Sequence, residues 1–108
     1  KVYYPGLEDH PGFDIARKQM KNFGGLLSFE LDSDKIDPRR FLDNLKMITP
    51  ALSLGGVETI ICAPVTTSHQ KMTDAQRAEL GITDSLLRLS AGIEDPEDII
   101  ADIDQALK

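Results

Sequence analysis

The stretch Leu86-Leu87-Arg88-Leu89-Ser90-Ala91-Gly92-Ile93-Glu94-Asp95-Pro96 combines a short apolar run with a marked helix start. Strand alternation would place Arg88 on the face opposite its two flanking leucines. Asp95 can cap the first free N–H groups of a helix, and Pro96 loses no hydrogen bond at the first helical position. Residues 86–96 therefore predict a β-strand that is followed closely by an α-helix.

The same two patterns recur elsewhere in the chain. Asp37-Pro38 predicts a second helix start, and the spacing of Thr73 and Gln76 resembles a capping box for a third helix that stops at Gly81. Short apolar runs bounded by Gly, Asp or Pro predict two more strands, at residues 26–31 and 59–64.

The expected helices each carry an apolar face. The helices that begin at Pro38 and Pro96 have apolar residues at i, i+1, i+4 and i+7 or i+8, so each is expected to bury one side. These residues are Phe41, Leu42, Leu45 and Ile48 in the first helix and Ile99, Ile100, Ile103 and Leu107 in the second. A fourth helix, upstream of Gly24-Gly25, is indicated by a stripe of Ile15, Ala16 and Met20. The alternation of strands and helices allows either a parallel α/β layer or an antiparallel sheet with helices on one face.

Composition restricts the classes of function. The chain has 108 residues, enough for one core, and its formal charge of −6 disfavours nucleic acid and membrane surfaces as partners. The single Cys62 forms no internal disulfide, and no signal-like or membrane-spanning run is present. We therefore expect a cytoplasmic location. Because the sequence starts at Lys1 without an initiator Met, we also expect a piece of a longer protein.

Several kinds of chemical site have little support in the sequence. His10 and His69 stand apart, without Cys, Asp or Glu at ligand spacing, so no metal site is expected. Cys62 lies in an apolar run and is interpreted as a core thiol, and no G-x-S-x-G elbow is present. The segment Ser53-Leu54-Gly55-Gly56 lacks the spacing of a phosphate-binding loop.

Arg88 is the most informative charged residue. A guanidinium in the middle of an apolar strand needs a partner, and two explanations are open. It is either structural, as an edge-strand guard or one half of an ion pair, or functional, as a planar donor that recognises a carboxylate ligand. The residues themselves do not separate these alternatives.

Six ordered motifs cover nearly the whole chain: Tyr4-Pro5-Gly6-Leu7, Gln19-Met20, Phe23-Gly24-Gly25, Leu27-Ser28-Phe29-Glu30-Leu31, Ser53-Leu54-Gly55-Gly56-Val57-Glu58 and Leu87-Arg88-Leu89-Ser90-Ala91-Gly92-Ile93-Glu94-Asp95. Together they resemble the Cys/Met-metabolism family of pyridoxal-phosphate (PLP) enzymes, which includes cystathionine γ-synthases, cystathionine lyases, methionine γ-lyases and acylhomoserine sulfhydrylases. The resemblance implies an α+β fold, namely the small C-terminal domain of fold-type I PLP enzymes, with a mainly antiparallel sheet and helices on one face. It assigns residues 1–23 to a loop and helix that connect from a large domain and residues 24–108 to the C-terminal domain.

The resemblance also implies a substrate site. Arg88 would hold the substrate α-carboxylate, with Ser53 and Leu54 beside it, and Leu52 would influence specificity. Family members that handle cystathionine at its γ-carbon commonly carry glutamate at the position of Leu52, whereas methionine-cleaving and sulfhydrylating members tend to be apolar there. A second explanation for Leu52 is that it is a core residue. The family pattern P-A-x-M-T-H reads Pro64-Val65-Thr66-Thr67-Ser68-His69 here, and His69 is interpreted as a structural hydrogen-bonding residue.

The catalytic residues of the family are expected outside this segment. Its Schiff-base lysine, the aspartate that pairs with the pyridine nitrogen and the phosphate-binding residues all belong to the large domain, so no catalytic, cofactor-binding or metal residue is assigned here. The seven lysines of the chain lie in polar or helical surface contexts. The implied partners are an amino-acid substrate, the large PLP domain and further copies in a homotetramer. The alternative is a noncatalytic module for amino-acid binding or oligomerisation.

Overall fold

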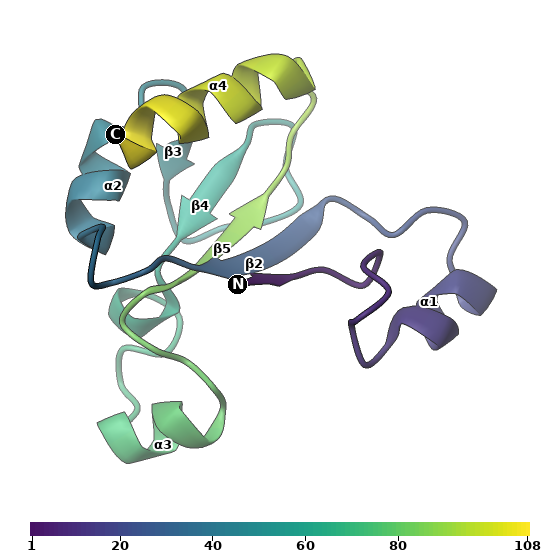
Figure 1. The fold of residues 1–108 in the computed structure, drawn as a ribbon, viewed down its shortest axis with the longest axis horizontal. Coiled ribbons are helices and arrows are strands. Elements are labelled where there is room, and N and C mark those ends of the chain that lie inside the picture. Colours follow the sequence, from purple (N-terminus) through teal and green to yellow (C-terminus); the bar gives the residue numbers. More distant parts are fainter.

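Five strands form one sheet in the order β1-β2-β5-β4-β3 in the computed structural model, which describes residues 1–108 (Figure 1). They are β1 (Val2–Tyr3), β2 (Leu26–Glu30), β3 (Thr49–Pro50), β4 (Ile60–Cys62) and β5 (Leu86–Ser90). Three of the neighbouring pairs are antiparallel, and only β3 and β4 run parallel. The expected mainly antiparallel α+β architecture is confirmed.

The three predicted strands are present; β2 and β5 are each one residue shorter than the apolar runs that indicated them, and β4 is half as long as the predicted run at residues 59–64. The other two strands, β1 and β3, are two residues long each and were not predicted. A strand of that length has no alternation to recognise, and it exists because a longer neighbour supplies its hydrogen-bond partners. Through β1, the first residues of the chain form one edge of the sheet.

Four α-helices are present, and three of them begin where the capping residues predict. They are α1 (Phe13–Gln19), α2 (Pro38–Asn44), α3 (Asp74–Glu79) and α4 (Pro96–Leu107), with a short 3-10 turn, η1 (Pro64–Thr66). The carboxylates of Asp37 and Asp95 each accept a hydrogen bond from the backbone N–H two residues later, at 2.9 Å. Thr73 and Gln76 form both hydrogen bonds of a capping box. None of these helices combines the length and apolarity needed to cross a bilayer.

The core lies between one face of the sheet and the pair α2 and α4, which contact each other (Figure 1). Eight buried residues form it: Phe41, Ile48, Ile61, Ala63, Leu87, Leu89, Ile99 and Ala106. The helices α1 and α3 lie away from this layer (Figure 1). Helices that cover only one face leave the other face of the sheet free to carry a site.

The segment after α2 is not helical, although the apolar pattern predicts that the helix continues. The helix ends at Asn44, so the expectation that it continues through Leu45 and Ile48 is wrong, although Ile48 is buried. The reason is the carboxylate of Asp102 in α4, which accepts hydrogen bonds from three consecutive backbone N–H groups, those of residues 46, 47 and 48, at 2.8 to 2.9 Å. These bonds replace the ones that a further helical turn would have made.

The apolar face of α4 is also wider than the part that the domain buries. Ile99 is in the core, but Ile100 is 58% exposed and Leu107 is 39% exposed. The expectation that all four apolar positions of this helix are buried is therefore wrong for these two. The stripe on α1 behaves similarly, since Ala16 is buried while Ile15 and Met20 are exposed.

Candidate functional site

Arg88 lies in the middle strand of the sheet, on the face opposite the helices. Its two neighbours in β5, Leu87 and Leu89, are 0% and 4% exposed and belong to the core, as alternation predicts. Directly across from Arg88 lie Ser28 in β2 and Cys62 in β4. Because β5 is third of five strands, the interpretation of Arg88 as an edge-strand guard is wrong.

The guanidinium of Arg88 has spare hydrogen-bonding capacity. Its Nη2 donates to the carbonyl oxygen of Ser53 at 3.0 Å, whereas its Nε is buried and has no hydrogen-bond partner. The four ion pairs of the chain involve other residues, so the interpretation of Arg88 as half of an internal ion pair is also wrong. A buried donor without a partner is costly unless a ligand supplies the acceptor.

Ser53 belongs to an exposed loop that is hydrogen-bonded to Ser90, the last residue of β5. The backbone N–H of Gly55 donates to Oγ of Ser90 at 2.8 Å, and Ser90 is buried. Gly55 has φ of +75°, a conformation that favours glycine. Ser90 therefore holds the turn in which the Ser53 carbonyl meets Arg88.

A second residue that holds this loop, Glu94, lies four residues after the end of β5. Glu94 accepts hydrogen bonds from the backbone N–H of Thr59 at 2.9 Å and from its hydroxyl at 2.7 Å. These two bonds, the backbone one first, hold the pKa of Glu94 below its usual range. Gly92 lies between Ser90 and Glu94 in the sequence. A Cβ at this position would meet the carbonyl oxygen of Val57 at 2.3 Å, so only glycine allows the backbone at residue 92 to lie this close to the loop. Residues that follow Arg88 thus hold the loop that carries Ser53 at two points, Gly55 in its middle and Thr59 at its C-terminal end.

Ser90, Gly92 and Glu94 were not predicted as residues of the site. One signal was available for Ser90, because alternation already places it on the same strand face as Arg88. The partners of Glu94 and Gly92 lie 33 to 35 residues earlier in the chain, and no local pattern indicates them.

The other residues assigned to the site lie on the same loop. Leu52 is 64% exposed and Leu54 is 53% exposed. The alternative explanation of Leu52 as a core residue is therefore wrong. A shallow hollow of about 190 Å³ adjoins the loop, lined by Leu26, Leu54, Gly55, Gly56, Ser90 and neighbouring residues. Exposed leucines near a guanidinium whose Nε lacks a partner make a surface that can contact both the apolar and the anionic part of a small molecule.

The residues present suit a substrate better than a covalently bound cofactor. All seven lysines are exposed, and none lies in the desolvated pocket that a nucleophilic amine needs. Cys62 is buried, and no group of three His, Cys, Asp or Glu residues is placed to hold a metal ion.

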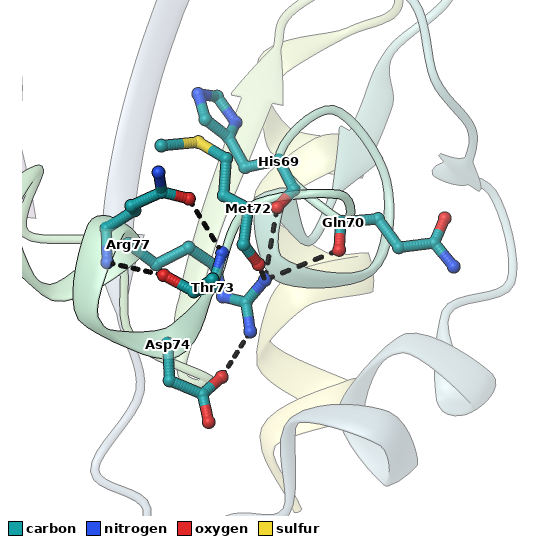
Figure 2. Close-up of polar contacts among 7 residues, drawn as sticks. His69, Gln70, Met72, Thr73, Asp74 and Arg77 are labelled. Carbon is teal, nitrogen blue, oxygen red and sulfur yellow. Dashed lines mark hydrogen bonds and ion pairs between the residues drawn. The ribbon is translucent and has the colours of Figure 1, made fainter.

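The segment that includes His69 is organised by Arg77 rather than by the histidine ring. Figure 2 shows the Arg77 guanidinium directed at the backbone carbonyls of His69, Gln70 and Met72 and at the carboxylate of Asp74. The His69 ring itself exchanges a hydrogen bond with the hydroxyl of Ser68 at 2.7 Å. Within this segment His69 therefore has a hydrogen-bonding role, as the sequence indicated.

The contribution of the Gly55–Ser90 hydrogen bond to the stability of the loop can be measured by amide hydrogen exchange. Ser90→Ala removes the acceptor of the Gly55 N–H, and we expect the loop to open more easily by about 1 kcal/mol, which raises the exchange rate of that amide roughly fivefold. Hydrogen exchange resolved to Gly55 measures this. Ser33→Ala, at an exposed serine outside the site, is the control and should leave the rate unchanged. An unchanged rate in Ser90→Ala would contradict the assigned anchoring.

Comparisons with known proteins agree with this architecture. The family described as Cys/Met metabolism PLP-dependent enzyme matches residues 1–108. An L-methionine gamma-lyase from Fusobacterium nucleatum is 52% identical over 108 residues, which cover 100% of this chain and 27% of that protein. A cystathionine gamma-synthase from Escherichia coli is 48% identical over 108 residues, covering 100% of this chain and 28% of that protein.

A solved structure extends the comparison to three dimensions. The cystathionine gamma-synthase from Xanthomonas oryzae pv. oryzae, in complex with cystathionine, has a TM-score of 0.91 and 48% sequence identity, over 99% of this chain and 28% of that one. The fold matches the C-terminal domain of fold-type I PLP enzymes. The chain spans little more than a quarter of the length of the relatives it matches.

Proposed function

The chain belongs to the Cys/Met-metabolism family of PLP-dependent enzymes, and on this premise we propose that it is the substrate-carboxylate-binding part of a longer enzyme of sulfur amino-acid metabolism. The proposed reaction class is C–S bond cleavage, or replacement at the γ-carbon of a homoserine ester. The candidate substrates are methionine, homocysteine, cystathionine and acylated homoserine.

The observation that carries the proposal is the guanidinium of Arg88. It lies in mid-sheet with a buried Nε that lacks a partner, and no carboxylate of this chain pairs with it. A planar fork of donors matches the two oxygens of a carboxylate, and the Ser53 carbonyl bound to Nη2 restricts the orientation of the fork. An amino-acid substrate supplies the missing carboxylate.

Holding the carboxylate contributes to catalysis through orientation. When bound in such an enzyme, PLP draws electrons from a bond at the substrate Cα. The Arg88 guanidinium would fix the carboxylate, and Ser53 and Leu54 would contact the substrate next to it, so that rotation about Cα is restricted. The hydrogen bonds from the loop to Ser90 and Glu94 would keep Ser53 and Leu54 in a fixed position relative to Arg88.

We propose that the rest of the site lies in the part of the parent chain that this segment does not contain. Because every lysine here is exposed, we assign the covalent attachment of PLP, and most of its binding, to a large domain upstream. Residues 1–23 would connect that domain to residues 24–108. We expect the 108-residue segment alone to be inactive.

The test is an assay of the full-length parent, purified with PLP, against methionine, homocysteine, cystathionine and acylated homoserine. Release of an α-keto acid, or formation of a new thioether with a thiol co-substrate, is the expected result. A parent that retains no PLP and turns over none of these substrates would refute the proposal and favour a noncatalytic amino-acid-binding or oligomerisation module.

Two further properties of the parent are proposed with it. We expect a homotetramer, which analytical ultracentrifugation of the full-length protein can measure, and a cytoplasmic location, which fractionation of the source cells can measure. A monomer, or recovery in a membrane or secreted fraction, would contradict them.

Leu52 is proposed to influence which substrate is preferred. A leucine beside the substrate side chain provides no partner for the distal ammonium of cystathionine, and desolvating that ammonium unpaired is unfavourable. We predict that the parent prefers methionine, homocysteine or an acylhomoserine, and that Leu52→Glu shifts the ratio of kcat/KM toward cystathionine by about tenfold, the effect of roughly 1.4 kcal/mol. Steady-state kinetics with both substrates measures the ratio.

Val57→Glu is the matched control, because Val57 lies on the same loop, is 70% exposed and has no assigned contact with substrate. It adds the same charge and should leave the ratio unchanged. A wild-type preference for cystathionine, together with an unchanged ratio in Leu52→Glu, would remove Leu52 from the specificity argument.

A further inference from the structure

One acidic residue, Glu30, lies on the same face of the sheet as Arg88. Leu27 and Phe29 of β2 pack against the core, so alternation directs Glu30 to the opposite face. Ser28 lies directly across from Arg88, and Glu30 follows Ser28 by two residues along β2. No other residue in the five strands is an aspartate or a glutamate. Glu30 is therefore the one acid within the sheet that could pair with Arg88.

Glu30 and Arg88 are diagonal neighbours on adjacent strands. Such neighbours lie about 7–8 Å apart, a distance that two long side chains can bridge. Opposite charges on one sheet face attract each other, and because both belong to the same chain, the effective concentration of the acid is high. Nevertheless no ion pair joins them, and the buried Nε of Arg88 has no acceptor. Some other interaction must therefore hold the carboxylate.

Two hydroxyl groups bind the Glu30 carboxylate, one on each oxygen. The Tyr3 hydroxyl donates to Oε2 at 2.8 Å, and the Thr83 hydroxyl donates to Oε1 at 2.8 Å. Tyr3 belongs to the edge strand β1 and Thr83 to the loop before β5, so the two donors come from separate elements. These bonds, that of Thr83 first, hold the pKa of Glu30 below its ordinary value of 4.5. Glu30 is thus an anion whose two oxygens both contact hydroxyls.

A carboxylate of the chain that paired with Arg88 would compete with the substrate for the same donors. A guanidinium fork binds a carboxylate through two parallel N–H groups, so an internal ion pair would have to break before an amino acid could bind there. We propose that Tyr3 and Thr83 are positioning residues that hold Glu30 away from Arg88 and so keep its guanidinium available to the substrate carboxylate. This inference rests on the carboxylate-binding role proposed for Arg88.

The test releases Glu30 in the full-length parent with PLP bound. Tyr3→Phe combined with Thr83→Val removes both hydroxyl donors with little change of shape. For the substrate that the parent turns over fastest, KM is expected to rise about fivefold, with kcat and PLP content unchanged. Adding Glu30→Gln to this double variant removes the competing charge and should restore the wild-type KM. Tyr4→Phe is the matched control, because the Tyr4 hydroxyl donates to the carbonyl oxygen of Gly24 at 2.7 Å, and it should leave KM unchanged.

Two kinetic results would overturn the inference. An unchanged KM in the double variant would mean that the hydroxyls do not keep Glu30 from Arg88. A raised KM that Glu30→Gln does not restore would mean that Tyr3 and Thr83 support only the fold. A crystal structure of the unliganded double variant is the second measurement. A Glu30 oxygen is expected within about 4 Å of the Arg88 guanidinium, and a longer distance would also overturn the inference.

The variant Arg88→Ala separates this inference from the proposed function. Full turnover in Arg88→Ala would refute the role of Arg88 and the inference together. A loss of activity in Arg88→Ala, combined with an unchanged KM in the double variant of Tyr3 and Thr83, would refute the inference alone.

Discussion

Arg88→Ala in the full-length parent is expected to lower kcat/KM about ten- to two-hundredfold. This corresponds to about 1.5–3 kcal/mol, the contribution of a hydrogen bond to a charged group. The reason is that the buried, partnerless Nε would otherwise pair with the substrate carboxylate, and no other arginine lies in the site. Arg88→Lys should recover little, because an ammonium does not reproduce the planar fork. Steady-state kinetics and the PLP content of the purified variant measure the effect.

PLP content should stay near the wild-type level, since the cofactor is assigned to the large domain. Arg39→Ala is the matched control, because Arg39 is an exposed arginine on α2, a helix on the opposite side of the sheet from Arg88. It should leave kcat/KM unchanged. If Arg88→Ala kept full turnover and lowered only the melting temperature, the residue would be structural.

Asp102→Ala should have the largest effect on stability. Its carboxylate is buried and accepts three backbone N–H bonds from residues 46–48, with a fourth from the side chain of Gln105 at 3.0 Å. Alanine would leave these backbone donors without acceptors, and we expect a loss of about 3 kcal/mol in the free energy of local unfolding. Amide exchange at Met47 and Ile48 in the parent should then accelerate about a hundredfold. Asp104→Ala, at an exposed aspartate on the same helix, is the control and should change little.

The same carboxylate predicts a dependence of stability on pH. Burial by itself raises the pKa of Asp102, but the N–H groups of residues 48, 46 and 47 outweigh it and hold the pKa below the ordinary value of 3.8. A pKa that is lower in the folded state means that the folded state binds its proton less readily. The stabilisation is therefore complete above pH 3.8 and is lost as the pH falls through the lowered pKa. The test compares amide hydrogen exchange at Ile48 in the wild type and in Asp102→Ala as the pH is lowered. If the wild-type rate does not approach the rate of Asp102→Ala on acidification, the assignment is contradicted.

Local features of the fold could be predicted from the sequence because they depend on a few adjacent residues. Asp37 and Asp95 before proline mark two helix starts, and Thr73 marks a third, since a cap acts on N–H groups two or three positions away. Alternation in residues 86–91 likewise places Arg88 on the face opposite the core. The motifs that resemble the family also predict the mainly antiparallel pairing of the sheet and the loop that carries Ser53.

Tertiary structure decided everything that depends on residues distant in the chain. Asp102 ends α2 from 54 to 56 residues away, and Glu94 and Ser90 hold the Ser53 loop from 35 residues away. The fold alone shows that Arg88 has no internal acid partner and that Leu52 is exposed. A periodic pattern indicates which face of a helix or strand is apolar or charged. It does not indicate which other element packs against that face. For this reason the sequence of α4 predicted a wide apolar face, and only the packing showed that Ile100 and Leu107 line an open groove.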